Sequence, residues 1–124
     1  MTHYPTPEVA AGIDRLIRHV NGVMAKHHAE MGLTYCRPNT VEVDSIGAKF
    51  IRLVRVENRL DGTSRKNSVY CFVAVSDSVT KALGPVKEGD LLKAASFKAP
   101  AKGVRGNMYT DLSRCTAYGM EYNR

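Results

Sequence analysis

Apolar residues recur every three or four positions along the first quarter of the chain, a spacing that places them on one face of a helix. The stretch opens with Thr6-Pro7-Glu8, a hydroxyl cap followed by proline at the first helical position, and it reaches Gly32, a residue type that commonly ends helices. The pattern predicts an amphipathic helix over residues 7–31. Its apolar stripe comprises Val9, Ile13, Leu16, Ile17, Val20, Val23, Met24 and Met31.

Segments rich in β-branched and aromatic residues follow, separated by turn-forming residues. They predict strands over residues 40–44, 49–58, 68–76 and 91–97. In the clearest one, 68–76, we expect Val69, Cys71, Val73 and Val75 on one face and Tyr70, Phe72 and Ala74 on the other. Residues 60–67 have the composition of a hairpin loop, 77–83 that of a short capped helix, and 98–107 that of an ordered loop.

These elements predict an α+β fold with one long N-terminal helix packed on an antiparallel sheet of three or four strands, followed by an ordered basic loop and a C-terminal tail. The length of 124 residues predicts a single domain over 1–124, and 44% hydrophobic with 24% charged residues is typical of a globular chain. No apolar run approaches the roughly 20 residues of a membrane span, so no membrane partner is expected.

Three cysteines form no CxxC pair, and the start of the chain lacks the pattern of a signal peptide, which together predict a reducing cytoplasm. The formal net charge is +6, and the basic excess falls in two segments. Residues 49–66 hold six basic and two acidic residues, and residues 93–105 hold four basic residues and no acid. Such clustering favours a polyanionic partner, although a positively biased surface with no specific partner remains the alternative.

The second basic segment supplies the strongest candidate site. Lys98, Lys102 and Arg105 are interleaved with Gly103 and Gly106, whose backbone N–H groups can face a phosphate without an obstructing Cβ. We expect this loop to bind phosphates, with Lys93, Arg52 and Arg55 extending the surface. The alternative is a surface loop whose cations pair with Asp90, Asp111 or Glu121.

Aromatic residues near these cations raise the question of base stacking. We expect Phe50, Phe72 and Phe97 to lie in the core, and Tyr70 and Tyr109 to be the candidates for exposure.

For enzymatic chemistry the sequence offers little. His27 and His28 lie near Cys36, but adjacent histidines point to different sides of a helix and no fourth ligand has suitable spacing. Cys71 is expected to be a buried hydrophobe and Cys115 to be the exposed thiol. We therefore expect a binding protein rather than an enzyme, with no catalytic residue, metal or cofactor.

Two stretches of the C-terminal half carry a resemblance. Residues 68–73 read Ser-Val-Tyr-Cys-Phe-Val, and residues 89–107 pass from Gly-Asp into a Lys-Ala-Ala-x-aromatic-Lys-Ala-Pro-Ala-Lys-x-x-Arg-Gly-Asn run. In these motifs the chain resembles a group of small uncharacterised tailed-bacteriophage proteins. The connection over residues 77–88 is longer here than the short hairpin of that group. The resemblance implies phage origin and expression in a bacterial host, and it implies no activity.

Taken together, these features predict a small phage nucleic-acid-binding accessory protein that contacts backbone phosphates with little sequence specificity. The alternative is a phage interaction protein, either a minor virion component or an early protein that binds an acidic host or phage protein. Hydrolysis of a phosphate ester is a third hypothesis. The expected location is the host bacterial cytoplasm, or the virion in the alternative.

Overall fold

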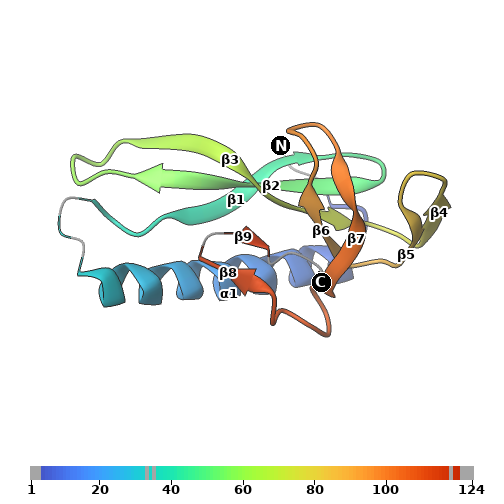
Figure 1. Ribbon diagram of the computed structural model, residues 1–124, viewed down its shortest axis with the longest axis horizontal. Coiled ribbons are helices and arrows are strands. Elements are labelled where there is room, and N and C mark those ends of the chain that lie inside the picture. Colours follow the sequence, from blue (N-terminus) through green and yellow to red (C-terminus); the bar gives the residue numbers. More distant parts are fainter. Residues whose placement is uncertain (1–3, 33, 35, 118, 121–124) are drawn as a thin grey trace.

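One long helix lies along a strongly twisted antiparallel sheet in the computed structural model, which describes residues 4–32, 34, 36–117 and 119–120 (Figure 1). Helix α1 (Pro7–Met31) has the predicted bounds. The Thr6 hydroxyl accepts a hydrogen bond from the Val9 N–H at 3.1 Å, and Gly32 ends the helix with φ 66°, a left-handed conformation that glycine adopts without a steric penalty.

The main sheet has five strands rather than the three or four predicted, in the order β1-β2-β3-β6-β7. A β4–β5 hairpin and a β8–β9 pair form two further small sheets. The strands are β1 (Thr40–Ile46), β2 (Phe50–Asn58), β3 (Ser64–Ala74), β4 (Ser78–Thr80), β5 (Gly84–Val86), β6 (Asp90–Ala94), β7 (Pro100–Asn107), β8 (Cys115–Thr116) and β9 (Gly119–Met120).

The additional strand is β7, which occupies most of the stretch predicted to be a loop. Its alanine, glycine and proline content gives it low strand propensity, yet it pairs with β6 along the edge of the sheet. Eight residues of β7 span five of β6, so the pairing contains bulges. Gly103 (φ 108°) and Gly106 (φ 150°) supply the backbone conformations that these bulges need.

The predicted short helix over 77–83 is also wrong, because the chain there forms the β4–β5 hairpin. The turn is closed by the Thr80 hydroxyl, which accepts a hydrogen bond from the Leu83 N–H at 3.1 Å, and by Gly84 with φ 72°. Ser76 and Asp77, whose side chains suit the cap of the predicted helix, instead lead into a turn, in which the Asp77 carboxylate accepts a hydrogen bond from the Glu88 N–H at 2.8 Å.

Both faces of the sheet are covered by apolar residues, and the larger cluster packs against α1. The expected alternation along β3 fails because eleven residues of β3 pair with nine of β2. An extra residue at Tyr70 places this side chain with Cys71, Val73 and Val75 on the α1 side. Val69 joins the opposite cluster.

The C-terminal segment packs beneath the sheet beside α1. Tyr70 is buried, contrary to the prediction, and its hydroxyl donates a hydrogen bond to the Thr116 carbonyl oxygen at 2.8 Å. Cys115, predicted to be exposed, is also buried, and burial raises the pKa of its thiol to about 11. Glu121, named above as a possible partner for the basic loop, lies outside the described residues.

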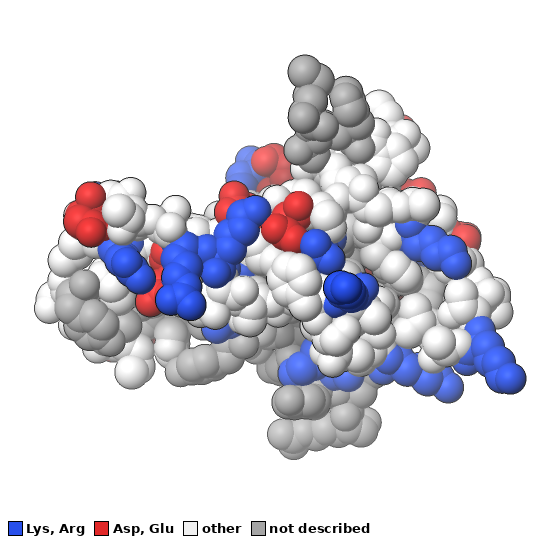
Figure 2. Space-filling model, turned by 90° about the horizontal axis from the view of Figure 1, so that it is seen from above, with Lys and Arg blue, Asp and Glu red and all other residues white. Residues whose placement is uncertain are grey.

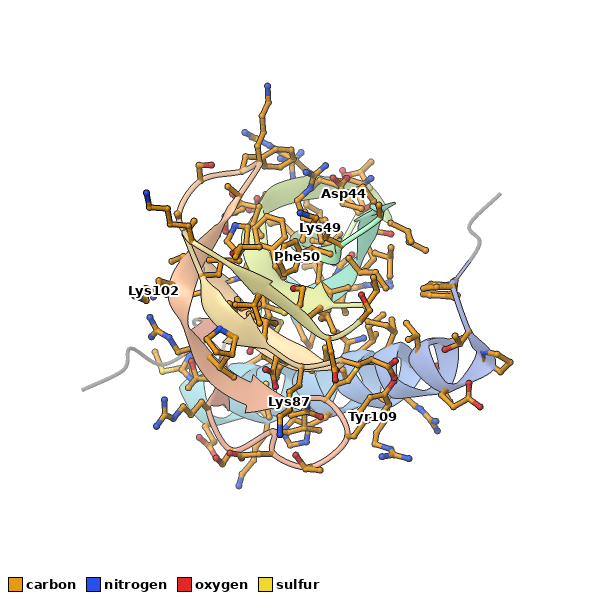
Figure 3. All side chains as sticks on the ribbon, turned by 90° about the vertical axis from the view of Figure 1, so that its right-hand side faces the viewer. Asp44, Lys49, Phe50, Lys87, Lys102 and Tyr109 are labelled. Carbon is orange, nitrogen blue, oxygen red and sulfur yellow. The ribbon has the colours of Figure 1, made fainter. Side chains whose placement is uncertain are left out.

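Tyr109 is half-buried beside α1, below Phe50 and Asp44 in the view of Figure 3. Gly12 and Gly89 leave room for its ring, because an added Cβ would lie 2.8 Å and 2.7 Å from ring carbons. The Tyr109 hydroxyl donates to a Glu88 carboxylate oxygen at 2.8 Å, and burial together with this bond raises the pKa of Tyr109 to about 12.

A side chain of α1 also covers part of the open edge of the sheet. The Asn21 side-chain oxygen accepts a hydrogen bond from the Val41 N–H at 2.8 Å, which satisfies a backbone donor of edge strand β1. Over the described residues, no helix combines the length and apolar character that crossing a membrane requires.

Candidate nucleic-acid interface

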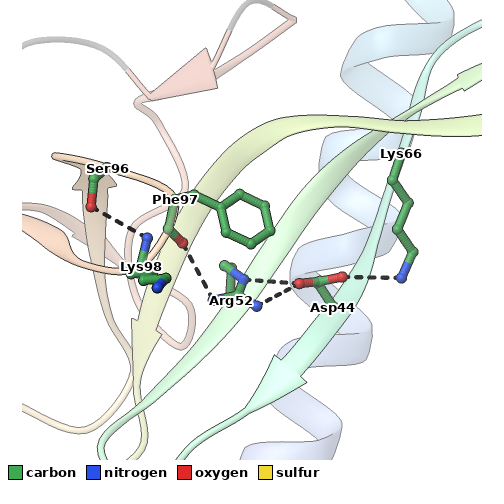
Figure 4. A network of polar contacts seen from close by, with 6 residues as sticks. All are labelled: Asp44, Arg52, Lys66, Ser96, Phe97 and Lys98. Carbon is green, nitrogen blue, oxygen red and sulfur yellow. Dashed lines mark hydrogen bonds and ion pairs between the residues drawn. The ribbon is translucent and has the colours of Figure 1, made fainter.

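The face of the five-stranded sheet that is turned away from α1 is called here the outer face. Lys and Arg side chains gather over it, and acidic side chains lie among them (Figure 2). The feature that organises it is a contact network between three strands and the β6–β7 turn (Figure 4). We name this network the outer-face cluster: Asp44, Arg52, Lys66, Phe97 and Lys98.

Asp44 is the centre of the polar contacts. It is the extra residue of a bulge in β1, where Val43 pairs with Leu53 and Ser45 pairs with Arg52. One carboxylate oxygen accepts two hydrogen bonds from the Arg52 guanidinium, at 2.9 and 2.7 Å, and the other lies 3.0 Å from Lys66 Nζ. Hydrogen bonding by Arg52, with a further bond from Lys66, holds the pKa of the Asp44 carboxyl below its ordinary value.

Phe97 covers the same guanidinium from the turn above. Arg52 Cζ lies 4.2 Å from the centroid of the Phe97 ring, within the range of a cation–π contact. Arg52 Nη1 also donates to the Phe97 carbonyl oxygen at 3.3 Å. Even so, 52% of Phe97 is exposed, which corrects the prediction that it lies in the core. Arg52 therefore supports an exposed aromatic ring.

Lys98 follows this ring in the turn. The turn is closed by hydrogen bonds from the Ala95 and Ser96 N–H groups to the Ala99 carbonyl oxygen, at 2.9 and 3.2 Å. Lys98 and, on β7, Lys102 are both exposed, and neither has a carboxylate within ion-pair distance among the described residues. These two lysines are available to an anion.

None of the remaining predicted cations belongs to the outer-face cluster. Arg55 pairs with Val41 on the α1 side of the sheet, and its Nη2 donates to the Ala117 carbonyl oxygen at 3.2 Å. Arg105 is only 7% exposed, with Nε donating to the Gly103 carbonyl oxygen at 3.3 Å. Lys93 is half-buried on β6. Bulges in the β2–β3 and β6–β7 pairings determine which way these side chains point. The positions of bulges cannot be read from a single sequence.

Gly103 and Gly106, which were predicted to face a phosphate, allow the backbone conformation and close packing of the bulged strand β7. At Gly106, an added Cβ would lie 2.5 Å from the Asp111 carbonyl oxygen. The neighbouring Asn107 amide donates to the Glu88 carbonyl oxygen at 3.0 Å and to Asp90 at 3.1 Å. Much of the Arg-Gly-Asn motif is thus explained by the packing of β7 against the turns beside it.

The candidate metal ligands form a polar contact instead. His28 Nε2 lies 2.9 Å from the Cys36 carbonyl oxygen and 3.8 Å from Cys36 Sγ. The described part of the chain holds no group of three or more His, Cys, Asp or Glu residues arranged to hold a metal ion.

Comparison with protein-family profiles gives one informative match, over residues 9–121. The chain belongs to the Family of unknown function (DUF7717). The match to DUF7717 covers α1 from Val9 onward, the whole main sheet and the complete outer-face cluster. No curated protein and no solved structure matches the chain.

Phe97 and Asp44 are the residues of the cluster whose roles the sequence analysis missed. Phe97 stands among small and polar neighbours, Ala95, Ser96 and Lys98, rather than within an apolar run, and that context is the signal of an exposed turn. Asp44 has no comparable signal, since its position depends on the bulge in β1.

Proposed function

We propose that this chain is a small phage-encoded accessory protein that binds single-stranded nucleic acid on its outer face, in the cytoplasm of a bacterial host. Phe97 stacks on a base, and Lys66, Lys98 and Lys102 contact backbone phosphates. The observation that carries the proposal is the exposed Phe97 ring seated on the Arg52 guanidinium, with lysines beside it. An exposed aromatic platform beside cations is how sequence-tolerant single-strand binders hold their ligand.

The geometry favours stacking because the ring is held before the ligand arrives. The Arg52 guanidinium packs against one face of the Phe97 ring. The hydrogen bond from Arg52 to the Phe97 carbonyl oxygen holds the backbone of the turn in place. Ordering a flexible side chain on binding costs free energy, and a ring that is already positioned avoids much of that cost. Arg52 is itself paired with Asp44, so its role is to position Phe97 rather than to contact phosphate.

The lysines supply the electrostatic part of binding. Lys66 is 56% exposed while it pairs with Asp44, so Nζ can reach a phosphate from its present position. Lys98 and Lys102 extend the positive charge across the turn and the edge strand. Contacts of this kind position a strand without reading its sequence, and therefore weak sequence specificity is expected.

The test is fluorescence anisotropy of labelled oligo(dT), oligo(U) and a DNA duplex, titrated with protein at several salt concentrations. Phe97→Ala is expected to weaken single-strand binding by about 10-fold or more, given the usual contribution of a stacked base. The double variant Lys98→Ala with Lys102→Ala is expected to reduce the salt slope by about 1 to 1.5, because each phosphate contact on a single strand contributes about 0.7.

Matched controls lie elsewhere on the surface. Leu60→Ala removes another exposed apolar side chain, and Lys81→Ala with Lys87→Ala removes two exposed lysines outside the outer-face cluster. Both are expected to leave affinity within about two-fold, since surface changes away from a contact have small effects. Equal losses in the control and cluster variants would contradict the assignment of this face.

A second candidate function is supported by the β4–β5 hairpin, which projects from the end of the sheet (Figure 1). Val79 at this hairpin is 78% exposed, and an exposed apolar side chain on a projecting element suits a protein contact. Under this alternative the chain binds an acidic host or phage protein, or is a minor virion component. Absence of nucleic-acid binding at low salt would favour it over the first proposal.

A further inference from the structure

A cleft of about 490 Å³ lies between α1 and the β2–β3 turn, away from the outer-face cluster. Its lining includes Arg37, Arg59, Asn21, Asn58, Thr40 and Pro38. We propose that this cleft binds a small molecule that carries a phosphate monoester, of the size of a nucleoside monophosphate. The site is separate from the proposed nucleic-acid interface and does not depend on it.

Hydrogen bonds fix the walls of the cleft from three segments. The Arg37 N–H donates to the Asn58 carbonyl oxygen at 3.2 Å, which ties the segment after α1 to the end of β2. The Asn58 side-chain amide donates to the Pro38 carbonyl oxygen at 3.0 Å and to the Thr40 hydroxyl oxygen at 3.1 Å. The Arg59 N–H donates to the Thr63 carbonyl oxygen at 3.0 Å, which closes the turn. The cleft is therefore formed before a ligand binds.

The side-chain donors of the cleft that can face a ligand are the guanidinium groups of Arg37 and Arg59 and the Asn21 amide. Among the described residues no acidic side chain lines it, and neither Arg37 nor Arg59 has a carboxylate within ion-pair distance. Asp61 lies beyond the lining and is occupied by Thr63, whose N–H and hydroxyl both donate to the same oxygen, at 2.8 and 2.6 Å. The Asn21 oxygen is taken by the Val41 N–H, so its amide hydrogens remain. Arg59 and Asp61 attract each other, and this attraction contributes to the lowered pKa of the Asp61 carboxyl. Together with Arg37 these three charges sum to +1, which favours an anion.

Size and chemistry narrow the class of ligand. A volume of about 490 Å³ lies within the usual range for small-molecule sites. Guanidinium groups match the geometry of phosphate oxygens and can donate two parallel hydrogen bonds. Ala25 and Pro38 add apolar surface against which a ring can pack. A dianionic phosphate attached to a ring system can contact the two arginines through the phosphate and the apolar surface of Ala25 and Pro38 through the ring.

The experiment is isothermal titration of the full chain with adenosine monophosphate, adenosine and inorganic phosphate. We expect adenosine monophosphate to bind at least about 10-fold more tightly than adenosine, since loss of a charge-assisted contact typically costs that much. The double variant Arg37→Ala with Arg59→Ala is expected to lose about 10-fold or more in affinity for adenosine monophosphate. Arg65→Ala, an exposed arginine on β3 outside the cleft, is the matched control and is expected to stay within about two-fold.

Circular dichroism and thermal unfolding confirm that each variant is folded before titration. Equal affinity for adenosine and adenosine monophosphate, no binding of either at millimolar concentration, or an equal loss in Arg65→Ala would overturn the proposal. A dinucleotide with a 5′ phosphate that binds while adenosine monophosphate does not would also overturn it, since the ligand would then be a strand end. The double variant is expected to keep oligo(dT) affinity, so failure here and failure of the proposed function are separate results.

Discussion

Asp44 joins three parts of the molecule through one carboxylate. It lies in β1, it accepts hydrogen bonds from Arg52 on β2 and Lys66 on β3, and through Arg52 it supports the Phe97 ring. Its side chain is 15% exposed, so these bonds form where water competes weakly. The orientation of the candidate stacking residue thus depends on an acidic residue that never contacts the ligand.

Replacing Asp44 by Asn is expected to lower the free energy of unfolding by about 1 to 2 kcal/mol at pH 7, since hydrogen bonds to charged groups are worth about that much. The folded protein holds the pKa of Asp44 below 3.8, so its stabilisation is present above that pH and is lost as pH falls through the folded pKa. Urea unfolding at pH 7 and pH 3 should therefore show a difference between variant and wild type that shrinks at pH 3.

The control is Asp14→Asn, which removes an exposed ion pair between successive turns of α1. Such pairs contribute little, and the expected change is below about 0.5 kcal/mol at either pH. If Asp44→Asn changed the free energy of unfolding as little as this control, the Asp44 network would contribute no more to stability than an exposed ion pair.

At the level of single residues, sequence reasoning succeeded where the environment follows from a regular period. Leu16 and Val20 are buried as the helical spacing predicts, and Cys71 is buried as expected for the middle of a strand. It failed for Tyr70 and Arg105, because one extra residue in a strand moves a side chain to the other face. It failed for Phe97 because this residue lies in the β6–β7 turn rather than in the predicted strand. Composition carries almost no information about where that extra residue falls.

Helix α1 owes its close approach to the chain after β7 to one glycine. Gly12 is buried, and an added Cβ would lie 2.8 Å from Met108 Cε and 2.8 Å from Tyr109 Cε1. Gly22, on the same helix, has no atom within 4 Å of such a Cβ. The two positions share backbone conformation and differ in packing alone.

Gly22→Ala is therefore expected to raise the free energy of unfolding by about 0.5 to 1 kcal/mol through helix propensity. Gly12→Ala gains the same propensity term but must displace Met108 and the Tyr109 ring, and overpacking of this kind costs about 1 to 3 kcal/mol. Thermal and urea unfolding of both variants gives the comparison. A Gly12→Ala protein more stable than the wild type would show that Met108 and Tyr109 can move away from the added methyl group without loss of stability.

Among the elements, α1 was predictable in full because its caps and its apolar period agree. The β2–β3 hairpin was predictable in outline. Strand β7 was not, because its glycines and proline argue against a strand, and only pairing with β6 overrides that local preference. The β4–β5 hairpin was missed because Ser-Asp capping chemistry serves turns as well as helices.

At the scale of the whole molecule, the C-terminal segment closes the core beneath the sheet. Met108 and Cys115 pack in the cluster that contains Leu16, Cys71 and Val73. Exposure of Cys71 or Cys115 therefore requires the helix, the sheet and this segment to separate, whereas Cys36 is partly exposed in the folded state.

Native labelling with iodoacetamide at pH 8 is expected to modify Cys36 first. Burial raises the pKa of the Cys71 and Cys115 thiols, which lowers the fraction of reactive thiolate, and it also blocks access of the reagent. Labelling of these two cysteines should therefore be slower than that of Cys36 by about 1,000-fold or more. Peptide mass spectrometry after timed quenching measures the three sites. Cys115 labelling as fast as Cys36 would show that the C-terminal segment detaches without global unfolding.

The two edges of the main sheet also bear on whether copies of this chain can pair edge to edge. Edge strand β1 is interrupted by the bulge at Asp44, and edge strand β7 carries Pro100, Lys102 and two glycines at its own bulges. A continuous ladder needs regularly spaced N–H and C=O groups, and neither edge presents them over a long run. The bulges that shape the outer face therefore also disfavour edge-to-edge pairing between copies of this sheet, and with it the growth of fibrils.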